Sequence, residues 1–521
     1  MRRSLTATAV ATASVLALPL LATPAAAHGG DPLDKVVFKQ VLKPETTGGI
    51  SKNMDFVANA PYQVTGGTRG MGGTDIEFAR IGGNDYAFLG TYQNGMQIAD
   101  ITNPAEPEVV SVYDCQILQG DVQVFRQGLR VLAAYTADSS FGAKGANSEC
   151  GQDLGIASGK LGTVLVDVTN PLEPKSVSFI EVPQGSHNMT VHPSGKYLYN
   201  SNSDLITSTT PNIAIIDIST PEAPKTLQNF RIPFVPTSLG SESHDITFNE
   251  DGTRAYSAAL SQTLILDTTK PEAPTVVSQI VDPTVQVSHG SDPITLTNKA
   301  GKERTFLLVS DEQLGAAAGT NCPGGGVHIY EITGTLEKAP KKVGTWFIGE
   351  TKPSTATCTA HVFRMHSEQG LFTIAWYDQG VRVVDVQGLA EQDLPVPFVA
   401  SGDAFGIREI GRYTFNDHNT WSFKTNKIEA DGSFYGYGND LGRGLDVYRF
   451  DGKALGRTVP VLEPVDLVPG AKVKKAKKSE LLPFLPVGGD GPAAAGLLLL
   501  GAAVLAGNVV LLRRRAGAAT A

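Results

Sequence analysis

Short apolar and alternating segments, separated by Gly, Pro, Asn and Asp, recur along the body of the chain. In one unit, an alternating segment HDITF (244–248) is followed by an apolar segment RAYSAAL (254–260). A fully apolar segment ending in an acid comes next, and then TVVSQI (275–280) after a Pro-rich turn. Segments of this length, bounded by turn residues, predict strands. The pattern therefore predicts a unit of four short strands.

The apolar strand that ends in an acid identifies the repeat. Its clear copies are GMQIADITNPAEP (95–107), GTVLVDVTNPLEP (162–174), NIAIIDISTPEAP (212–224) and QTLILDTTKPEAP (262–274). Weaker copies are GVHIYEITGTLEKAP (326–340), GVRVVDVQGLAEQDLP (380–395) and GLDVYRFDG (444–452). The acid or hydroxyl after each strand can accept bonds from backbone amides, and the prolines prevent the strand from continuing. Four-stranded units repeated in phase predict an all-β fold, a seven-bladed β-propeller over residues 71–452.

The repeated strand, which reads TVLVD, AIIDI and TLILD in three units, resembles the strand that names the LVIVD-repeat family. The resemblance extends over roughly residues 70–452. It implies a β-propeller surface protein and carries no specific chemistry.

The seventh unit lacks a recognisable fourth strand. In the N-terminal segment 28–70, either VVFKQVL (36–42) or MDFVANA (54–60) could supply that strand and close the ring. Closure removes exposed sheet edges, which otherwise pair with other chains.

Five histidines share one position of the repeat, the start of the first strand. They are His187, His244, His289, His361 and His418. First strands of propeller blades line the central channel, so these side chains should meet at one mouth of it. Converging imidazoles bind transition metals, and the sequence predicts one iron, copper or zinc ion. The alternative is structural, since each ring could instead bond the backbone of the neighbouring blade.

Three carboxylates occur near the same position. Each could orient a histidine ring by accepting a hydrogen bond from the ring nitrogen that does not bind the metal. They are Asp75, Asp121 and Asp245.

Four cysteines, Cys115, Cys150, Cys322 and Cys358, fit an oxidising compartment. Three pairings are possible; we expect neighbours to pair, Cys115 with Cys150 and Cys322 with Cys358.

The termini predict export and anchoring. Residues 1–27 have the charged start, apolar stretch and small-residue end of a signal peptide. Residues 453–492 predict a Pro-, Lys- and Ala-rich stalk, 493–512 an uncharged transmembrane helix and 513–521 a basic cytoplasmic tail. The segment LPVGG (485–489) resembles a sortase signal but has Gly488 where threonine is required, so a retained single-pass anchor is favoured.

Net charge and export together exclude nucleic acid as a partner, since the chain carries −9. The sequence therefore predicts a cell-surface, membrane-anchored binding module with a histidine-lined metal site, directed at a cell-wall or other extracellular ligand. The alternative is a metal-dependent oxidase or oxygenase that uses the same histidines.

Overall fold

The computed structural model describes residues 44–63, 72–237, 239–313, 322–354, 357–393 and 395–470. They belong to one compact unit, Met1–Ala476; a second unit, Lys477–Ala521, lies outside the described residues. The predicted signal peptide 1–27, membrane helix 493–512 and tail 513–521 also lie outside them. Among the described residues, no helix has both the length and the apolar character needed to cross a bilayer.

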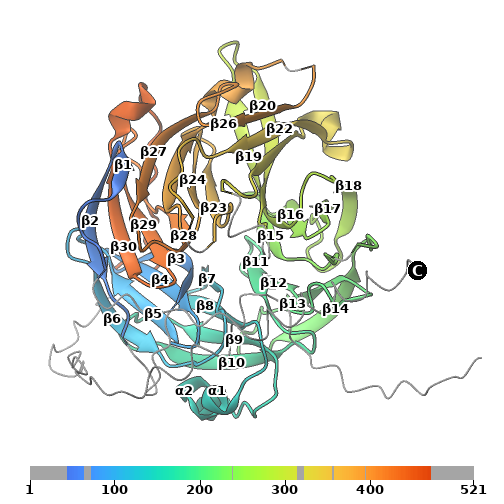
Figure 1. The fold of residues 1–521 in the computed structure, drawn as a ribbon. Coiled ribbons are helices and arrows are strands. Elements are labelled where there is room, and N and C mark those ends of the chain that lie inside the picture. The colour runs from blue at the N-terminus through green and yellow to red at the C-terminus, as the bar shows by residue number, and fades with distance from the viewer. Residues whose placement is uncertain are drawn as a thin grey trace, which may run out of the picture. The chain divides into compact units, whose positions relative to one another are not determined.

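Seven sheets surround a common axis, as predicted (Figure 1). Blades 1 to 4 are continuous in sequence. Blade 1 contains β3 (Gly73–Ile81), β4 (Asn84–Thr91), β5 (Met96–Asp100) and β6 (Glu108–Tyr113). Blade 2 contains β7 (Val122–Gln127), β8 (Arg130–Ala137), β9 (Gly162–Asp167) and β10 (Lys175–Glu181). Blade 3 contains β11 (Asn188–Val191), β12 (Tyr197–Ser201), β13 (Asn212–Asp217) and β14 (Lys225–Arg231). Blade 4 contains β15 (Asp245–Phe248), β16 (Arg254–Ala259), β17 (Gln262–Asp267) and β18 (Thr275–Ile280).

Blades 5 and 6 each gain a fifth strand. Blade 5 contains β19 (Ser288–Thr297), β20 (Glu303–Asp311), β21 (Val327–Glu331) and β22 (Lys341–Phe347), with β26 (Phe398–Ser401) added in parallel. Blade 6 contains β23 (Phe363–His366), β24 (Leu371–Ala375), β25 (Val381–Asp385) and β27 (Arg408–Thr414), with β1 (Ile50–Lys52) at its outer edge.

Blade 7 closes the ring with a strand from the start of the described chain. Its first three strands are β28 (Thr420–Lys424), β29 (Phe434–Asp440) and β30 (Gly444–Phe450). The fourth is β2 (Met54–Ala60), which pairs antiparallel with β30. Of the two predicted closing segments, 54–60 therefore supplies the strand, while 36–42 lies outside the described residues.

The repeat motif is fully apolar because its strand is covered on both faces. In β17 the first five residues are buried, and β9 has the same pattern. The outer strand β14 has an alternating, mostly exposed pattern. Neighbouring blades pack face to face, so both faces of the third strand are buried. The outer strands keep residues exposed to solvent.

The acid that ends the motif makes the predicted turn. A carboxylate oxygen accepts the backbone N–H two residues later in four blades, at 2.8–3.0 Å: Asp100 from Thr102, Asp167 from Thr169, Asp217 from Ser219 and Asp267 from Thr269. This side-chain turn stops the strand before the prolines.

Both predicted disulfides are present. Cys115 bonds Cys150, and Cys322 bonds Cys358. The first holds an insertion that forms the short helices α1 (Ala143–Asn147) and α2 (Glu149–Asp153).

The start of the predicted stalk packs on the propeller instead. Residues 452–455 form a 3-10 turn, and Arg457 forms an ion pair with Asp385 at 2.8 Å. Leu462 bridges Ile428 and Asp466 bridges Arg80. Residues 453–470 thus belong to the folded unit, because their charged and apolar side chains find partners along blades 1, 6 and 7. A stalk begins no earlier than residue 471, beyond which nothing is described.

Candidate metal centre

Four of the five predicted histidines come together. His187, His244 and His361 precede β11, β15 and β23, and His289 is the second residue of β19, so they come from blades 3 to 6. Their ring centroids follow one another at 4.2, 4.3 and 4.2 Å. All four are at least 95% buried. We call this group the histidine arc.

Three rings of the arc are held through Nδ1 by groups that can only accept. His187 Nδ1 lies 2.9 Å from Asp138 Oδ1, and His244 Nδ1 lies 3.1 Å from the backbone oxygen of His289. His361 Nδ1 lies 2.6 Å from the backbone oxygen of Trp421. Each Nδ1 must therefore carry the proton, which leaves a lone pair on Nε2 when the ring is neutral.

The Nε2 atoms face the interior of the arc. His187 Nε2 and His244 Nε2 are 3.0 Å apart. Within the described part of the chain, His361 Nε2 has no hydrogen-bond partner. Each contact at Nδ1 therefore joins one blade to the next, as the structural alternative predicted. The same contacts orient the rings so that their Nε2 atoms form a group.

Burial keeps three of these rings neutral. Burial, followed by the neighbouring histidines, lowers the pKa of His244 and of His289 well below the ordinary value. Burial lowers the pKa of His361 to about 3. Neutral imidazole is the form that binds metal ions.

Glu312 completes the group. It directly follows β20, and its oxygens lie 3.7 Å from His289 Nε2 and 3.5 Å from His361 Nε2. The Tyr377 hydroxyl donates to the same carboxylate at 2.5 Å. One ligand atom each from His244, His289 and Glu312 lies within 4.8 Å of the others.

Sequence reasoning missed Asp138 and Glu312, although a signal exists. Each is the residue immediately after the second strand of its blade, β8 and β20. First and second strands are antiparallel, so the end of the second lies beside the start of the first, where the histidines are. In the sequence, an acidic residue directly after a second strand indicates such a contact with the histidines.

His418 lies outside the arc. Its Nδ1 accepts the N–H of Phe415 at 3.2 Å, and its Nε2 lies 2.8 Å from the Tyr448 hydroxyl. The arc position of blade 7 is occupied by Trp421, whose ring is 4.4 Å from that of His361. Trp421 sits at the same β-bulge in β28 that His289 occupies in β19. Blade 7 begins its first strand later than the sequence alignment placed it, which moves His418 into the preceding loop.

The three predicted orienting carboxylates lie on the channel wall. Asp75 forms an ion pair with Lys424 at 2.7 Å, Asp121 accepts the N–H of Met189, and Asp245 accepts the N–H of Ile246. None of the three hydrogen-bonds a histidine ring of the described residues; Asp138 does so, and Glu312 lies close to two rings. Burial, then Asp75 and Asp245, raises the pKa of Asp121 well above the usual range. Burial, then Asp292, raises that of Asp245 to about 7.

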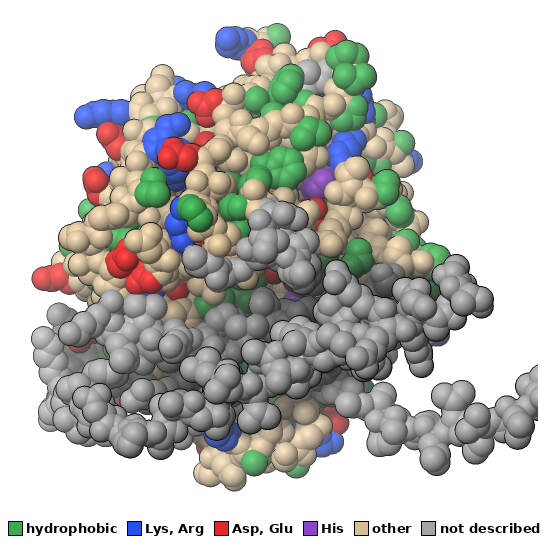
Figure 2. Space-filling model, in the orientation of Figure 1, with side chains coloured by type: hydrophobic (Ala, Val, Ile, Leu, Met, Phe, Trp, Pro, Cys, Tyr) green, Lys and Arg blue, Asp and Glu red, His purple; other side chains and the backbone are tan. Residues whose placement is uncertain are grey.

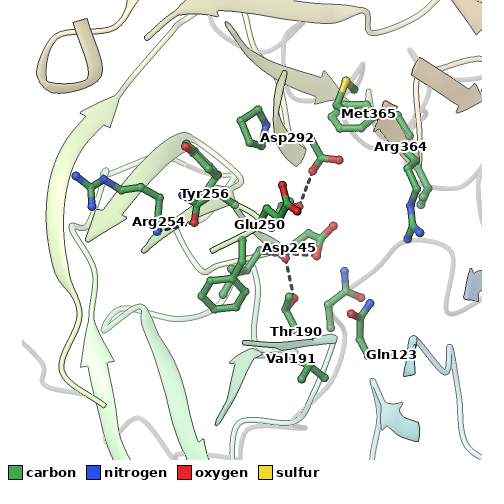
Figure 3. Close-up of a pocket in the computed structure, with 18 of the residues that line it drawn as sticks. Gln123, Thr190, Val191, Asp245, Glu250, Arg254, Tyr256, Asp292, Arg364 and Met365 are labelled. Carbon is green, nitrogen blue, oxygen red and sulfur yellow. Dashed lines mark hydrogen bonds between the residues drawn. The ribbon is translucent and has the colours of Figure 1, made fainter. Parts of the chain in front are cut away.

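A cavity of about 1350 Å³ opens over the arc. Residues from the first strands of all seven blades line it, together with His187, His244 and His289. Figure 3 shows Gln123, Asp245, Asp292 and Arg364 directed into this space. On the exterior face in Figure 2, acidic and basic side chains are interspersed over the described blades.

Basic side chains form ion pairs with only some of the acidic residues that line the cavity. Lys424 contacts both Asp75 and Glu77, and Arg364 contacts Glu77. Burial would raise the pKa of Glu77, but Arg364 and Lys424 together lower it. The opposite side of the cavity, with Asp245 and Asp292, has no such ion pair among the described residues. The cavity can therefore receive a polar or cationic ligand.

No curated protein matches the chain. Among solved structures, the chain is similar to the periplasmic gluconolactonase of Pseudomonas aeruginosa, with 11% identity, a TM-score of 0.48, and 73% of this chain and 96% of that chain covered. The hydrazine synthase of Kuenenia stuttgartiensis has 13% identity and a TM-score of 0.44, covering 74% and 99%. Neither similarity carries a conclusion about the function of this chain. The model of the LVIVD repeat matches residues 82–115, so the chain carries the repeat that its recurring strand motif predicted.

Proposed function

We propose that this protein is an exported binding module that holds one transition metal ion in the histidine arc and takes a polar ligand into the cavity above. The observation that carries the proposal is the orientation of the rings. Three of the rings donate their Nδ1–H to an acceptor. Nε2 of His187 lies 3.0 Å from Nε2 of His244. Two lone pairs at that distance repel each other, and a cation beside them removes the repulsion.

The donor atoms fit such an ion. Imidazole nitrogens with one carboxylate suit zinc, copper or iron, and three of the four rings have at Nδ1 the acceptor that metal-bound histidines usually have. The ligands would be drawn from His187, His244, His289, His361 and Glu312. The buried Nε2 of His361, which has no hydrogen-bond partner among described residues, fits this role.

Export is supported by the two disulfides, which persist in oxidising compartments. Attachment to the membrane through residues 493–512 remains part of the proposal and rests on the sequence. Its ligand would be a cell-wall or other extracellular molecule.

Elemental analysis of the purified full-length protein tests the metal site. We expect one metal ion per chain in the parent, and its loss in a folded variant carrying both His244→Ala and His361→Ala. His192→Gln is the matched control, because His192 is a buried histidine bonded to Gly252 and Ser194, outside the arc. A parent without metal after reconstitution with zinc, copper and iron would refute the site.

A second function, a metal-dependent oxidase or oxygenase, is favoured by one observation. Three arc histidines line the large cavity, so a substrate could reach a metal ion held there. Such an ion would supply oxygen or redox chemistry, and the protein would bind and position the substrate. Oxygen consumption by the metal-loaded parent, absent from the double variant, would favour the enzyme over the binding module.

A further inference from the structure

Three carboxylates of the cavity wall use only part of their capacity to accept hydrogen bonds. Asp121, Asp245 and Asp292 line the cavity, and Figure 3 shows the last two directed into it. Asp121 is 8% exposed. In each, one oxygen accepts a hydrogen bond from a residue of a first strand. Within the described ranges the second oxygen accepts none, and we call the three groups the open carboxylates.

The open carboxylates follow one side of the channel. They belong to blades 2, 4 and 5, and hydrogen bonds between first strands connect these blades. A backbone N–H of blade 3 bonds Asp121, and the Thr190 hydroxyl of blade 3 bonds the backbone of blade 4. The Thr247 hydroxyl of blade 4 then bonds Asp292 in blade 5. The acids are therefore fixed at separate points along the wall.

The basic side chains that line the cavity are engaged elsewhere. Lys424 and Arg364 both form ion pairs with Glu77, and Arg254 forms one with Glu337. In the part of the chain that the structure describes, no ion pair involves an open carboxylate. Burial raises the pKa of all three open carboxylates. A bound cation would favour their ionised forms.

One metal ion cannot satisfy all three open carboxylates. An ion requires its ligand atoms to lie within a few ångströms of one another. Over the described residues, the group of three acids or histidines with ligand atoms within 4.8 Å of one another is His244, His289 and Glu312. The open carboxylates are spread more widely than that, so positive charge is needed at more than one point.

His289 gives a separate indication of a ligand. It lines the cavity and is only 5% exposed. Its Nδ1 has no hydrogen-bond partner among the described residues, whereas Nδ1 of the other three arc histidines is bonded. Buried polar atoms are nearly always satisfied. A ligand within the cavity would supply the missing partner.

We propose that the ligand of the cavity is an aliphatic oligoamine, a molecule with several ammonium groups, held by the open carboxylates. The inference rests on the proposed function and names the class of its ligand. Each ammonium group has three N–H donors and matches an ionised oxygen that is free to accept. The methylene groups between them would lie against the apolar part of the lining, which includes Ile246, Phe363 and Met365.

Calorimetric titration of the purified full-length protein with the triamine spermidine tests the proposal. We expect one saturable site per chain. Butylamine, which has a single ammonium group, should bind at least about tenfold more weakly, because it leaves most of the carboxylate charge unpaired. The competing explanation is loose attraction of any cation to the surface of a chain with a net charge of −9.

Asp245→Asn and Asp292→Asn, made separately, should each weaken spermidine binding at least about tenfold, since each removes one charge that faces the ligand. Asparagine retains an oxygen that accepts the present hydrogen bond, and circular dichroism verifies that each variant folds. Elemental analysis should find the same metal content in parent and variants. Glu303→Gln is the control and should bind like the parent, because Glu303 is an exposed carboxylate at the start of β20.

The outcomes separate this proposal from the metal centre. A parent that contains metal but shows no saturable spermidine binding would overturn the oligoamine and leave the metal centre in place. Equal spermidine affinity in the parent and the folded variants would also overturn it, since surface charge would then hold the amine. A parent that binds spermidine but no metal would support the oligoamine and refute the metal centre alone.

Discussion

His187 and His244, from neighbouring blades, bring their Nε2 atoms to 3.0 Å from each other while their Nδ1 atoms are bound to Asp138 and to a backbone carbonyl. Two neutral rings held in this way present two lone pairs to the same point. The contact is stable only if a proton or a metal ion shares that point. Burial opposes the protonated form of His244. Metal binding and simple support of the blades lead to different responses to substitution.

Asp138→Asn should weaken metal binding while leaving the fold intact. Asparagine can still accept the Nδ1–H of His187, but it lacks the charge that makes the ring a better ligand. Loss of such a partner typically costs about tenfold or more in affinity. Competitive titration against a metal indicator measures the change, with Asp153→Asn, in α2, as the control. Unchanged affinity would show that His187 is not a ligand.

His418→Ala should destabilise the protein and retain the metal. The substitution leaves the Phe415 N–H and the Tyr448 hydroxyl without this partner next to the closing strand pair β30 and β2. We expect a loss of about 2–4 kcal/mol in the free energy of unfolding. Urea unfolding gives the stability, and elemental analysis gives the metal content. Metal loss at unchanged stability would instead restore His418 as a ligand.

Asp292 should make stability fall as pH rises. Burial raises its pKa from 3.8 to about 6, so the native state binds more protons than the unfolded state between these values. Stability therefore decreases as pH increases from about 4 to about 6, by at most about 3 kcal/mol from this group. Asp292→Asn removes the effect, since asparagine can still accept from Thr247.

Melting temperatures of parent and Asp292→Asn from pH 4 to pH 8 provide the test. The variant should be the more stable of the two at pH 8, and the difference should shrink toward pH 4. A constant difference over this range would show that the Asp292 carboxyl is not the titrating group.

The two disulfides should differ in their effect on the metal. Replacing either pair by alanine should cost about 2–5 kcal/mol in stability. Only the loss of Cys322–Cys358 should also weaken metal binding, because that bond ties the chain after Glu312 to the segment before His361. Thr359 makes the same connection, accepting the N–H of Gln313 at 2.9 Å.

Replacement of Cys115 and Cys150 is therefore the matched control. Metal affinity measured on both double variants, at a temperature where each is folded, decides the question. Equal affinities would show that the position of Glu312 does not depend on its disulfide.

The four-strand units, the turns after the motif acids and both disulfides follow from the sequence, which also limits the closing strand to 36–42 or 54–60. These features are local or repeated, so spacing along the chain specifies them. Four of the five histidines could also be placed together, because a repeat puts equivalent residues at equivalent points of a ring.

Only the tertiary structure decided the remainder of the site. Trp421 takes the arc position that spacing assigned to His418, because the first strand of blade 7 begins only at Thr420 and leaves His418 in the preceding loop. Asp138 and Glu312 reach the arc from the ends of second strands, and residues 453–470 pack on the blades. Each of these depends on contacts between segments distant in sequence, which burial and charge pairing select and which local patterns do not encode.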